Sequence, residues 1–130
     1  MKKIAILFAS VFLVMSLTGC SRYHNSYKAV GFVHSNKADS AFMNFYYFEG
    51  RMVFRLKSTE EGDLKYTAKL ESGNAAVYYD FYGTKQELFS ISAGEEIDSH
   101  GGYVESGTVY LIVETDGACR NGDFQFSLNP

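Results

Sequence analysis

Cys20 is the residue whose type and position point most directly to a chemical reaction. It ends the run Leu17-Thr18-Gly19-Cys20, in which two small residues stand directly before the cysteine. A cysteine thiolate is a nucleophile, and small preceding side chains leave the neighbouring peptide bond open to a peptidase. The spacing therefore predicts a cysteine that is modified and exposed by cleavage, not one that packs in a core.

The segment before Cys20 has the layout of a secretory signal. Lys2 and Lys3 are followed by a run from Ile4 to Leu17 that is apolar apart from two serines. A basic start followed by a short apolar run is typical of a signal peptide. About fourteen apolar residues are too few to cross a hydrocarbon core, which takes about twenty in a helix. We therefore predict that residues 1–19 are a cleaved signal peptide.

Together with Cys20, this segment resembles the lipobox of bacterial lipoproteins. The resemblance covers Leu17 to Cys20. It implies that the mature chain begins at Cys20 and carries two or three acyl chains, which anchor a protein far more stably than one chain does. The implied location is the cell membrane or outer membrane, on the extracytoplasmic side. The alternative is a plain secretory signal with a cysteine near its cleavage point.

Charge excludes one class of partner. The chain has 12 Lys and Arg and 15 Asp and Glu, and removal of residues 1–19 takes away two of the basic residues and none of the acidic ones. A surface that binds nucleic acid needs an excess of basic residues. We therefore expect no nucleic-acid partner for the single domain that this length allows.

The other residue types that carry chemistry show no catalytic pattern. With Cys20 acylated, Cys119 has no disulfide partner within the chain, and we expect it to pack as a small apolar residue. A nucleophilic cysteine works with a histidine, and His24, His34 and His100 form no family signature with Cys119. No serine stands in a Gly-x-Ser-x-Gly elbow, and no His-Glu-x-x-His is present. We predict a protein without enzymatic activity or cofactor.

One loop contains residues that calcium could use. Asp116, Asn121 and Asp123 stand in the sequence DGACRNGD. This sequence lacks the spaced acidic set of an EF-hand loop, and hairpin loops prefer the same residue types. We therefore predict no metal site there.

Alternation of apolar and polar residues begins after Ala41. Residues 20–41 are mostly small and polar, which predicts a tether, and part of it around Val30 and Phe32 could dock on a sheet as a strand. Residues 64–71, LKYTAKLE, alternate without exception, as a half-buried strand requires. The folded domain is predicted over residues 42–130.

Seven segments have this strand pattern: FMNFYYF, RMVFRLK, LKYTAKLE, AAVYYDFY, ELFSISA, TVYLIVE and DFQFSLN. The first two are predicted to form a hairpin at Glu49-Gly50, since glycine takes the positive φ of a tight turn. Glycine turns about every ten residues predict an all-β fold, an antiparallel β-sandwich. The side chains predicted to face inward are Phe54, Leu56, Leu64, Tyr66, Leu70, Val77, Tyr79, Phe81, Phe89, Ile91, Val109, Leu111, Val113, Phe124, Phe126 and Leu128.

The end of the chain, SGTVYLIVETDGACRNGDFQFSLN, resembles the last two strands of small bacterial jelly-roll modules. The modules concerned are pre-peptidase C-terminal domains and some carbohydrate-binding modules, and the match spans roughly residues 42–129. The resemblance implies a jelly-roll-like sandwich whose last strand returns through a short loop. It implies no function by itself. The tryptophan that carbohydrate-binding modules commonly stack on a sugar is missing.

The predicted binding site rests on tyrosines. If Val77 faces the core, the period of two turns Tyr78, Asp80 and Tyr82 outward, and Tyr110 is turned outward on its own strand. Tyrosine offers a flat ring and a hydroxyl group, which suits sugars and protein surfaces. We predict that Tyr78, Asp80, Tyr82 and Tyr110 bind a ligand. The alternative is that the tether or a loop covers this face.

Two functions are compatible with these predictions. One is a membrane-anchored, non-catalytic recognition module for a glycan or an envelope protein. The other is a structural or accessory envelope lipoprotein with no small-molecule ligand. A contiguous exposed aromatic patch favours the first, and a uniformly polar surface favours the second.

Overall fold

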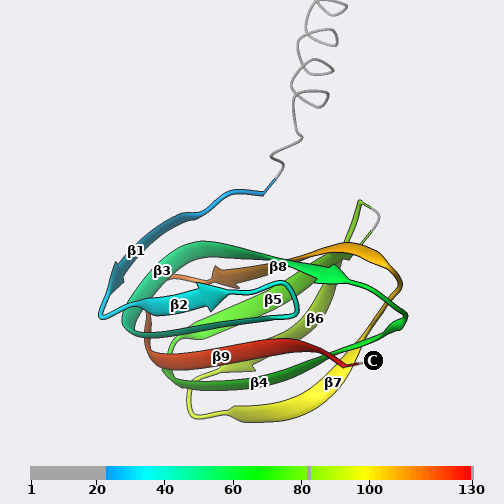
Figure 1. Ribbon diagram of the computed structural model, residues 1–130. Coiled ribbons are helices and arrows are strands. Elements are labelled where there is room, and N and C mark those ends of the chain that lie inside the picture. Colours follow the sequence, from blue (N-terminus) through cyan, green and yellow to red (C-terminus); the bar gives the residue numbers. More distant parts are fainter. Residues whose placement is uncertain (1–22, 82, 130) are drawn as a thin grey trace, which may run out of the picture.

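The computed structural model describes residues 23–81 and 83–129, and all regular elements among them are strands (Figure 1). The strands are β1 (Ser26–Val30), β2 (Val33–Asn36), β3 (Ser40–Ser58), β4 (Gly62–Ser72), β5 (Asn74–Phe81), β6 (Thr84–Ser92), β7 (Glu96–Val104), β8 (Gly107–Thr115) and β9 (Cys119–Asn129). The described part of the chain contains no helix long and apolar enough to cross a membrane. The predicted signal peptide, Cys20 and Tyr82 lie outside the described residues.

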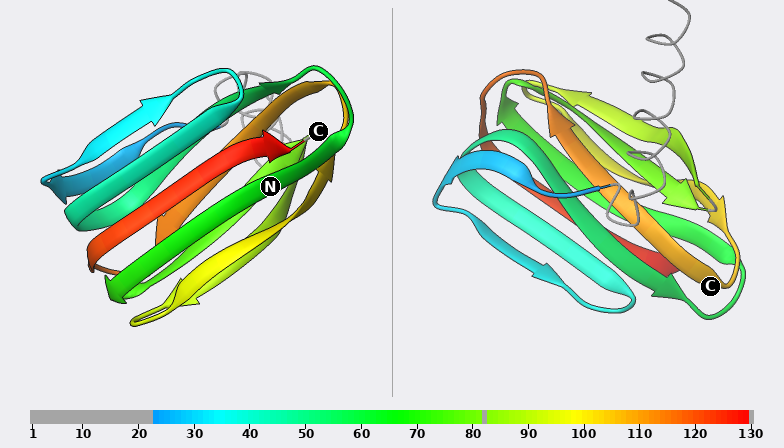
Figure 2. Two further views of the ribbon diagram at one scale, coloured as in Figure 1. Left: turned by 60° about the horizontal axis from the view of Figure 1, so that its bottom comes forward. Right: turned by 90° about the horizontal axis from the view of Figure 1, so that it is seen from above.

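The strands form two packed layers that share β3. Residues 40–48 of β3 pair with β9, and residues 51–58 pair with β8, both antiparallel. β9 continues to β4 and β7, whereas β8 continues to β5 and β6. The two panels of Figure 2 show the β9–β4–β7 layer from its outer side and the β8–β5–β6 layer from above. The predicted antiparallel β-sandwich is confirmed, and its sheet is nearly barrel-shaped.

The predicted hairpin at Glu49-Gly50 is wrong, because β3 runs through it. Gly50 has a positive φ of 132°, but it does not form a turn. It lets the backbone of β1 come close to the backbone of β3. A Cβ at this position would lie 2.2 Å from the carbonyl oxygen of Ser26 on β1. Only glycine lets the two backbones come this close, so β3 continues from one layer into the other.

The core lies between the layers, where the predicted inward residues meet. All of them are buried except Phe81 and Leu128, which are half-buried and pack against the core. The rings of Tyr66 on β4 and Phe89 on β6 stack with centroids 4.6 Å apart. Each large apolar side chain buried in this way contributes roughly 1.5–3 kcal/mol. The alternation in the sequence thus identifies these core residues correctly, although Met43, Phe45 and Phe48 of β3 are also buried in the core and were not among those predicted.

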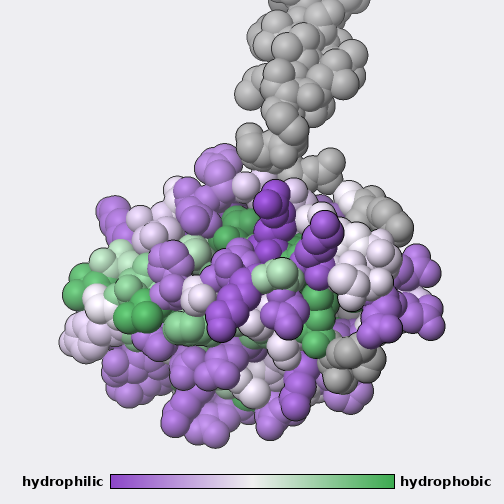
Figure 3. All heavy atoms as spheres, in the orientation of Figure 1, coloured by the Kyte–Doolittle hydropathy of each residue, from purple (hydrophilic) through white to green (hydrophobic). Residues whose placement is uncertain are grey.

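The predicted tether contributes two strands. β1 pairs with residues 47–51 of β3, and β2 pairs with residues 41–44. The boundary predicted between residues 41 and 42 therefore falls inside β3. Apolar side chains gather where β1 and β2 meet, and Val30 and Val33 are 59% and 55% exposed there (Figure 3).

Candidate functional site

The tyrosine face predicted from the sequence lies on the outer side of β5 and β8. Asp80 of β5 stands directly opposite Tyr110 of β8. Tyr78 is half-buried, and the Nζ of Lys85 lies 4.4 Å from its ring centroid. Lys85 and Arg51 both form ion pairs with Glu114, at 3.0 and 3.1 Å.

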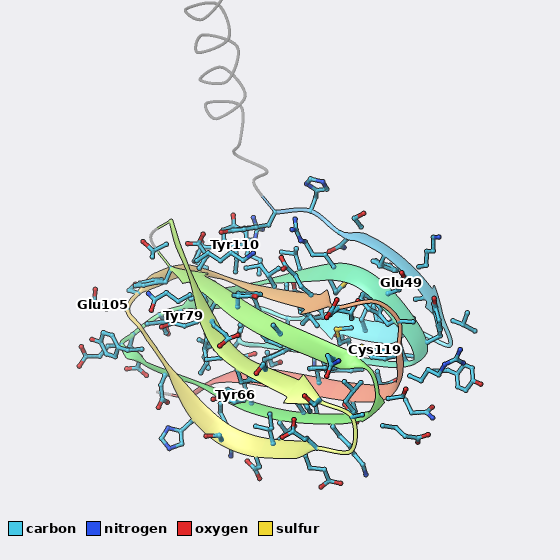
Figure 4. All side chains as sticks on the ribbon, turned by 180° about the vertical axis from the view of Figure 1, so that it is seen from behind. Glu49, Tyr66, Tyr79, Glu105, Tyr110 and Cys119 are labelled. Carbon is cyan, nitrogen blue, oxygen red and sulfur yellow. The ribbon has the colours of Figure 1, made fainter. Side chains whose placement is uncertain are left out.

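The first described residues of the chain cross this face. The hydroxyl of Tyr23 donates a hydrogen bond to Oδ2 of Asp80, and its ring centroid lies 5.4 Å from that of Tyr110. Figure 4 labels Tyr110 close to this segment. Asp80 is only 2% exposed and Ile112 is fully buried. The side chains point out of the core as predicted, but Tyr23 lies over them, so the ligand-binding role of these residues remains a prediction.

The outer side of the other layer is open and carries rows of polar side chains. β2, β3, β9, β4 and β7 lie side by side here, and the strand register aligns their outward residues. One row is Ser35, Phe42, Gln125, Thr67 and Asp98, and the next is Val33, Asn44, Asp123, Lys69 and Glu96. Directly opposed side chains have Cβ atoms about 5 Å apart, so each row can contact one extended ligand.

Two hollows lie along these rows. The first has a volume of about 620 Å³ and extends from β2 across β3 and β9 to β4. The second, of about 420 Å³, extends from β9 across β4 to β7. Thr67, Asp123 and Gln125 line both hollows. We call the two together the groove, defined by Ser35, Phe42, Asn44, Lys65, Thr67, Asp98, Asp123, Gln125 and Ser127.

The groove is equipped for hydrogen bonding. Asn44 and Gln125 supply amides, which both donate and accept, and Thr67 supplies a hydroxyl group. Oδ1 of Asp123 is buried and accepts no hydrogen bond from any described residue. A buried acceptor without a donor is costly and rare in folded proteins. Asp123 as a whole is half-buried and lines both hollows, so its carboxylate stands at the wall of the groove.

One aromatic side chain accompanies these polar groups. Phe42 is half-buried on the outer side of β3, next to Gln125 of β9. Its neighbours Ala41 and Met43 are buried in the core, which fixes the outward direction of Phe42. Its ring therefore gives the groove an apolar surface beside the hydrogen-bonding groups.

His100 and Asp63 form the pair that most resembles a catalytic arrangement. Nδ1 of His100 lies 2.6 Å from Oδ2 of Asp63, across the β4–β7 pairing. The His100 side chain is 69% exposed, and no described serine or cysteine is hydrogen bonded to it. Among residues 23–81 and 83–129, no three His, Cys, Asp or Glu residues are grouped to hold a metal ion.

Cys119 packs in the core, as the sequence predicts. It is fully buried, and its Sγ lies 3.3 Å from the carbonyl oxygen of Asn74. Burial raises the pKa of the thiol, because the charged form would lose its water. Cys119 is therefore protonated at neutral pH and is a poor nucleophile.

Sequence reasoning missed the groove. The available signal was the face opposite the core in residues 44–46 and 123–127, which carries amide, hydroxyl and carboxylate groups at every second position. β9 pairs with β3 and β4 and not with β8, which brings Gln125 to the groove and not to the face that carries Tyr110. The strand order was needed to see which polar residues meet.

Comparisons with known proteins place the chain in no family. No protein-family model matches it, and no curated protein matches it. Among solved structures, the pre-peptidase C-terminal domain of a collagenase from Bacillus anthracis has a TM-score of 0.48 at 10% identity, over 73% of this chain and 91% of that one. The carbohydrate-binding module TmCBM61, solved with beta-1,4-galactotriose, has a TM-score of 0.47 at 13% identity, over 81% and 87%.

Two further solved structures of similar shape are a carbohydrate-binding module and a cupin domain. A family 29 carbohydrate-binding module has a TM-score of 0.39 at 17% identity, over 80% of this chain and 72% of that one. The cupin domain of Drosophila melanogaster CENP-C has a TM-score of 0.34 at 16% identity, over 82% and 76%. Similarity at this level carries no argument about function, so the function must be argued from the groove.

Proposed function

We propose that this protein is a lipid-anchored envelope protein whose sandwich domain binds a glycan, without catalysis, in the groove. The observation that carries the glycan proposal is a groove lined by amide, hydroxyl and carboxylate side chains next to the ring of Phe42. Sugar hydroxyl groups are donors and acceptors at once. They match Asn44, Thr67 and Gln125, which offer both kinds of group.

The remaining features of the groove suit a sugar chain. Phe42 offers a ring face to the apolar side of a sugar, while Asp123 accepts a charge-assisted hydrogen bond, about twice as strong as a neutral one. The groove crosses five strands, which at about 4.8 Å per strand interval gives a length of about 20 Å. A surface of this length fits several sugar units in a row.

The anchoring part of the proposal rests on the sequence. The lipobox-like run Leu17 to Cys20 and the basic, apolar segment before it support acylation of Cys20. TmCBM61 is named as a carbohydrate-binding module, but its TM-score below 0.5 adds no weight here. The glycan proposal therefore depends on the groove alone.

A binding screen tests the glycan proposal. The chain without residues 1–19 and with Cys20→Ser is applied to an immobilised panel of oligosaccharides. We expect binding that weakens about tenfold or more in Asp123→Ala, since a hydrogen bond involving a charged group contributes about 1.5–3 kcal/mol. In Gln125→Ala we expect a smaller, several-fold loss, because a neutral hydrogen bond contributes about 0.5–1.5 kcal/mol. Asp116→Ala, an exposed carboxylate outside the groove, is the control. Absence of binding to the whole panel, or binding that neither groove variant weakens, would contradict the proposal.

A further inference from the structure

We infer that the outer face of the β3–β8–β5 layer lies against the lipid surface that holds the anchor, so that the groove faces away from the membrane. This inference rests on the proposed acylation of Cys20. It concerns orientation, which the proposed function leaves open. The partner it assigns to this face is a lipid surface with anionic headgroups.

The chain between Cys20 and the described domain is short. Cys20 precedes Tyr23 by three residues. A fully extended chain spans at most about 3.6 Å per residue, so Cys20 lies within about 11 Å of Tyr23. Acyl chains on Cys20 would hold that residue at the level of the headgroups. Tyr23 would then lie at the membrane surface too.

Tyr23 is docked to the sandwich. Its hydroxyl is bonded to the buried Asp80 and its ring packs on Tyr110. Two residues later, Oδ1 of Asn25 accepts a hydrogen bond of 2.7 Å from the backbone N–H of Val53. The right panel of Figure 2 shows these first described residues, in blue, beside β8. The anchor is thus followed by a docked segment and not by a long tether.

The charged side chains of the β3–β8–β5 face suit a surface of anionic headgroups. On this face and on the neighbouring strand β6, the outward side chains include four cations, Arg51, Arg55, Lys57 and Lys85, and three carboxylates, Asp80, Glu87 and Glu114. The chain from Cys20 onward has 10 basic and 15 acidic residues, so this face is basic relative to the whole. Arg55 and Lys57 are exposed and form no ion pair with a described residue. Anionic headgroups attract such side chains.

The outer side of the opposite layer would face away from the membrane. The groove lies on the outer side of β9 and β4, on the far side of the core from Tyr110. If the β3–β8–β5 face is against lipid, Gln125 in the groove is directed into the surrounding solution. Thr108 on β8 and Gln125 on β9 are both exposed, so they are suitable positions for a matched pair of labels.

The experiment uses the full acylated chain in vesicles of phosphatidylcholine and phosphatidylglycerol that contain a nickel-chelating lipid. Thr108→Cys and Gln125→Cys each carry a nitroxide, while Cys119 is buried and is expected to stay unlabelled. We expect relaxation by the nickel lipid to be several-fold greater at position 108 than at 125, and Tyr23→Ala to abolish this contrast. Equal relaxation at both positions, a greater effect at 125, or a contrast unchanged in Tyr23→Ala would overturn the inference.

A mass measurement separates the two proposals. If Cys20 carries no acyl chain, the proposed anchoring fails and the inference fails with it. If Cys20 is acylated and the two labels relax equally, only the inferred orientation fails. Glycan binding is measured independently of both.

Discussion

Tyr23 and Asp80, 57 positions apart in the sequence, are joined by a hydrogen bond from the tyrosine hydroxyl to Oδ2 of the aspartate. The bond connects the start of the described chain to the middle strand of the β8–β5–β6 layer. It occupies the face that the sequence suggested for a ligand. Within the segment predicted as a tether, β1 and β2 belong to the folded domain, which includes the part around Val30 that was predicted to dock as a strand.

Tyr23→Phe tests the contribution of this bond. The substitution keeps the ring against Tyr110 and removes only the donor to Asp80. We expect a loss of roughly 1–3 kcal/mol in the free energy of unfolding, because the acceptor is a buried carboxylate. Urea denaturation of the two chains measures it. Tyr46→Phe, at a residue that is 54% exposed, is the control, and equal midpoints for Tyr23→Phe and the parent chain would contradict the assignment.

Gly50→Ala tests the bend of β3. The new Cβ would meet the Ser26 carbonyl oxygen at 2.2 Å and the Cα of Tyr27 at 2.7 Å. Gly94→Ala is the matched control, because Gly94 also has a positive φ but has no neighbour within 4 Å of its Cβ position. We expect Gly50→Ala to be about 1–3 kcal/mol more destabilising than Gly94→Ala, the range found for overpacked sites. Similar losses in the two variants would show that backbone conformation alone matters.

Because Cys119 is buried, we expect the free energy of unfolding to fall at alkaline pH. Its folded pKa is raised above the ordinary value of 9.0, so the folded state keeps the proton while the unfolded state loses it. The free energy of unfolding is therefore unaffected below the unfolded pKa and falls as pH rises above it, by at most about 1.4 kcal/mol per pH unit. Unfolding at pH 8 and pH 10 measures the fall. A Cys119→Ala chain should lose less stability over this interval, and an equal loss would contradict the prediction.

Cys20→Ser tests the anchor. The serine hydroxyl cannot replace the thiolate as a nucleophile, so we expect an unprocessed or released chain. Membrane fractionation and the mass of the mature N-terminus measure the outcome. Ser21→Ala, which leaves the cysteine in place, is the control. Normal membrane retention of Cys20→Ser, together with a parent chain free of acyl mass, would end the lipoprotein proposal.

The alternation of apolar and polar residues predicted most strands and their buried faces. It could not predict which strands, far apart in the sequence, pair with one another. Leu64 and Tyr66 alternate with Lys65 and Thr67, and the first pair is buried. The strand β7 was missed because most of its side chains are exposed and it contains two adjacent glycines. Such an edge strand has no apolar alternation to detect.

The candidate sites could also be predicted only in part from the sequence. The pattern around Val77 correctly gives the side of β5 on which Asp80 lies, but it does not say that Tyr23 covers that side. Asp123 and Gln125 join Phe42 and Thr67 only through the order β3–β9–β4. This order pairs strands that lie far apart in the sequence, and the local pattern of residues does not encode such pairing.

The measurement that tests the central claim most directly is a chemical-shift titration of the soluble chain with an oligosaccharide that binds it. The account predicts that the perturbed backbone amides cluster at residues 42–44, 65–67 and 123–127, and that those of Tyr78 and Tyr110 are unchanged. Perturbations centred on Tyr78 and Tyr110 would place the ligand on the tyrosine face and contradict the account.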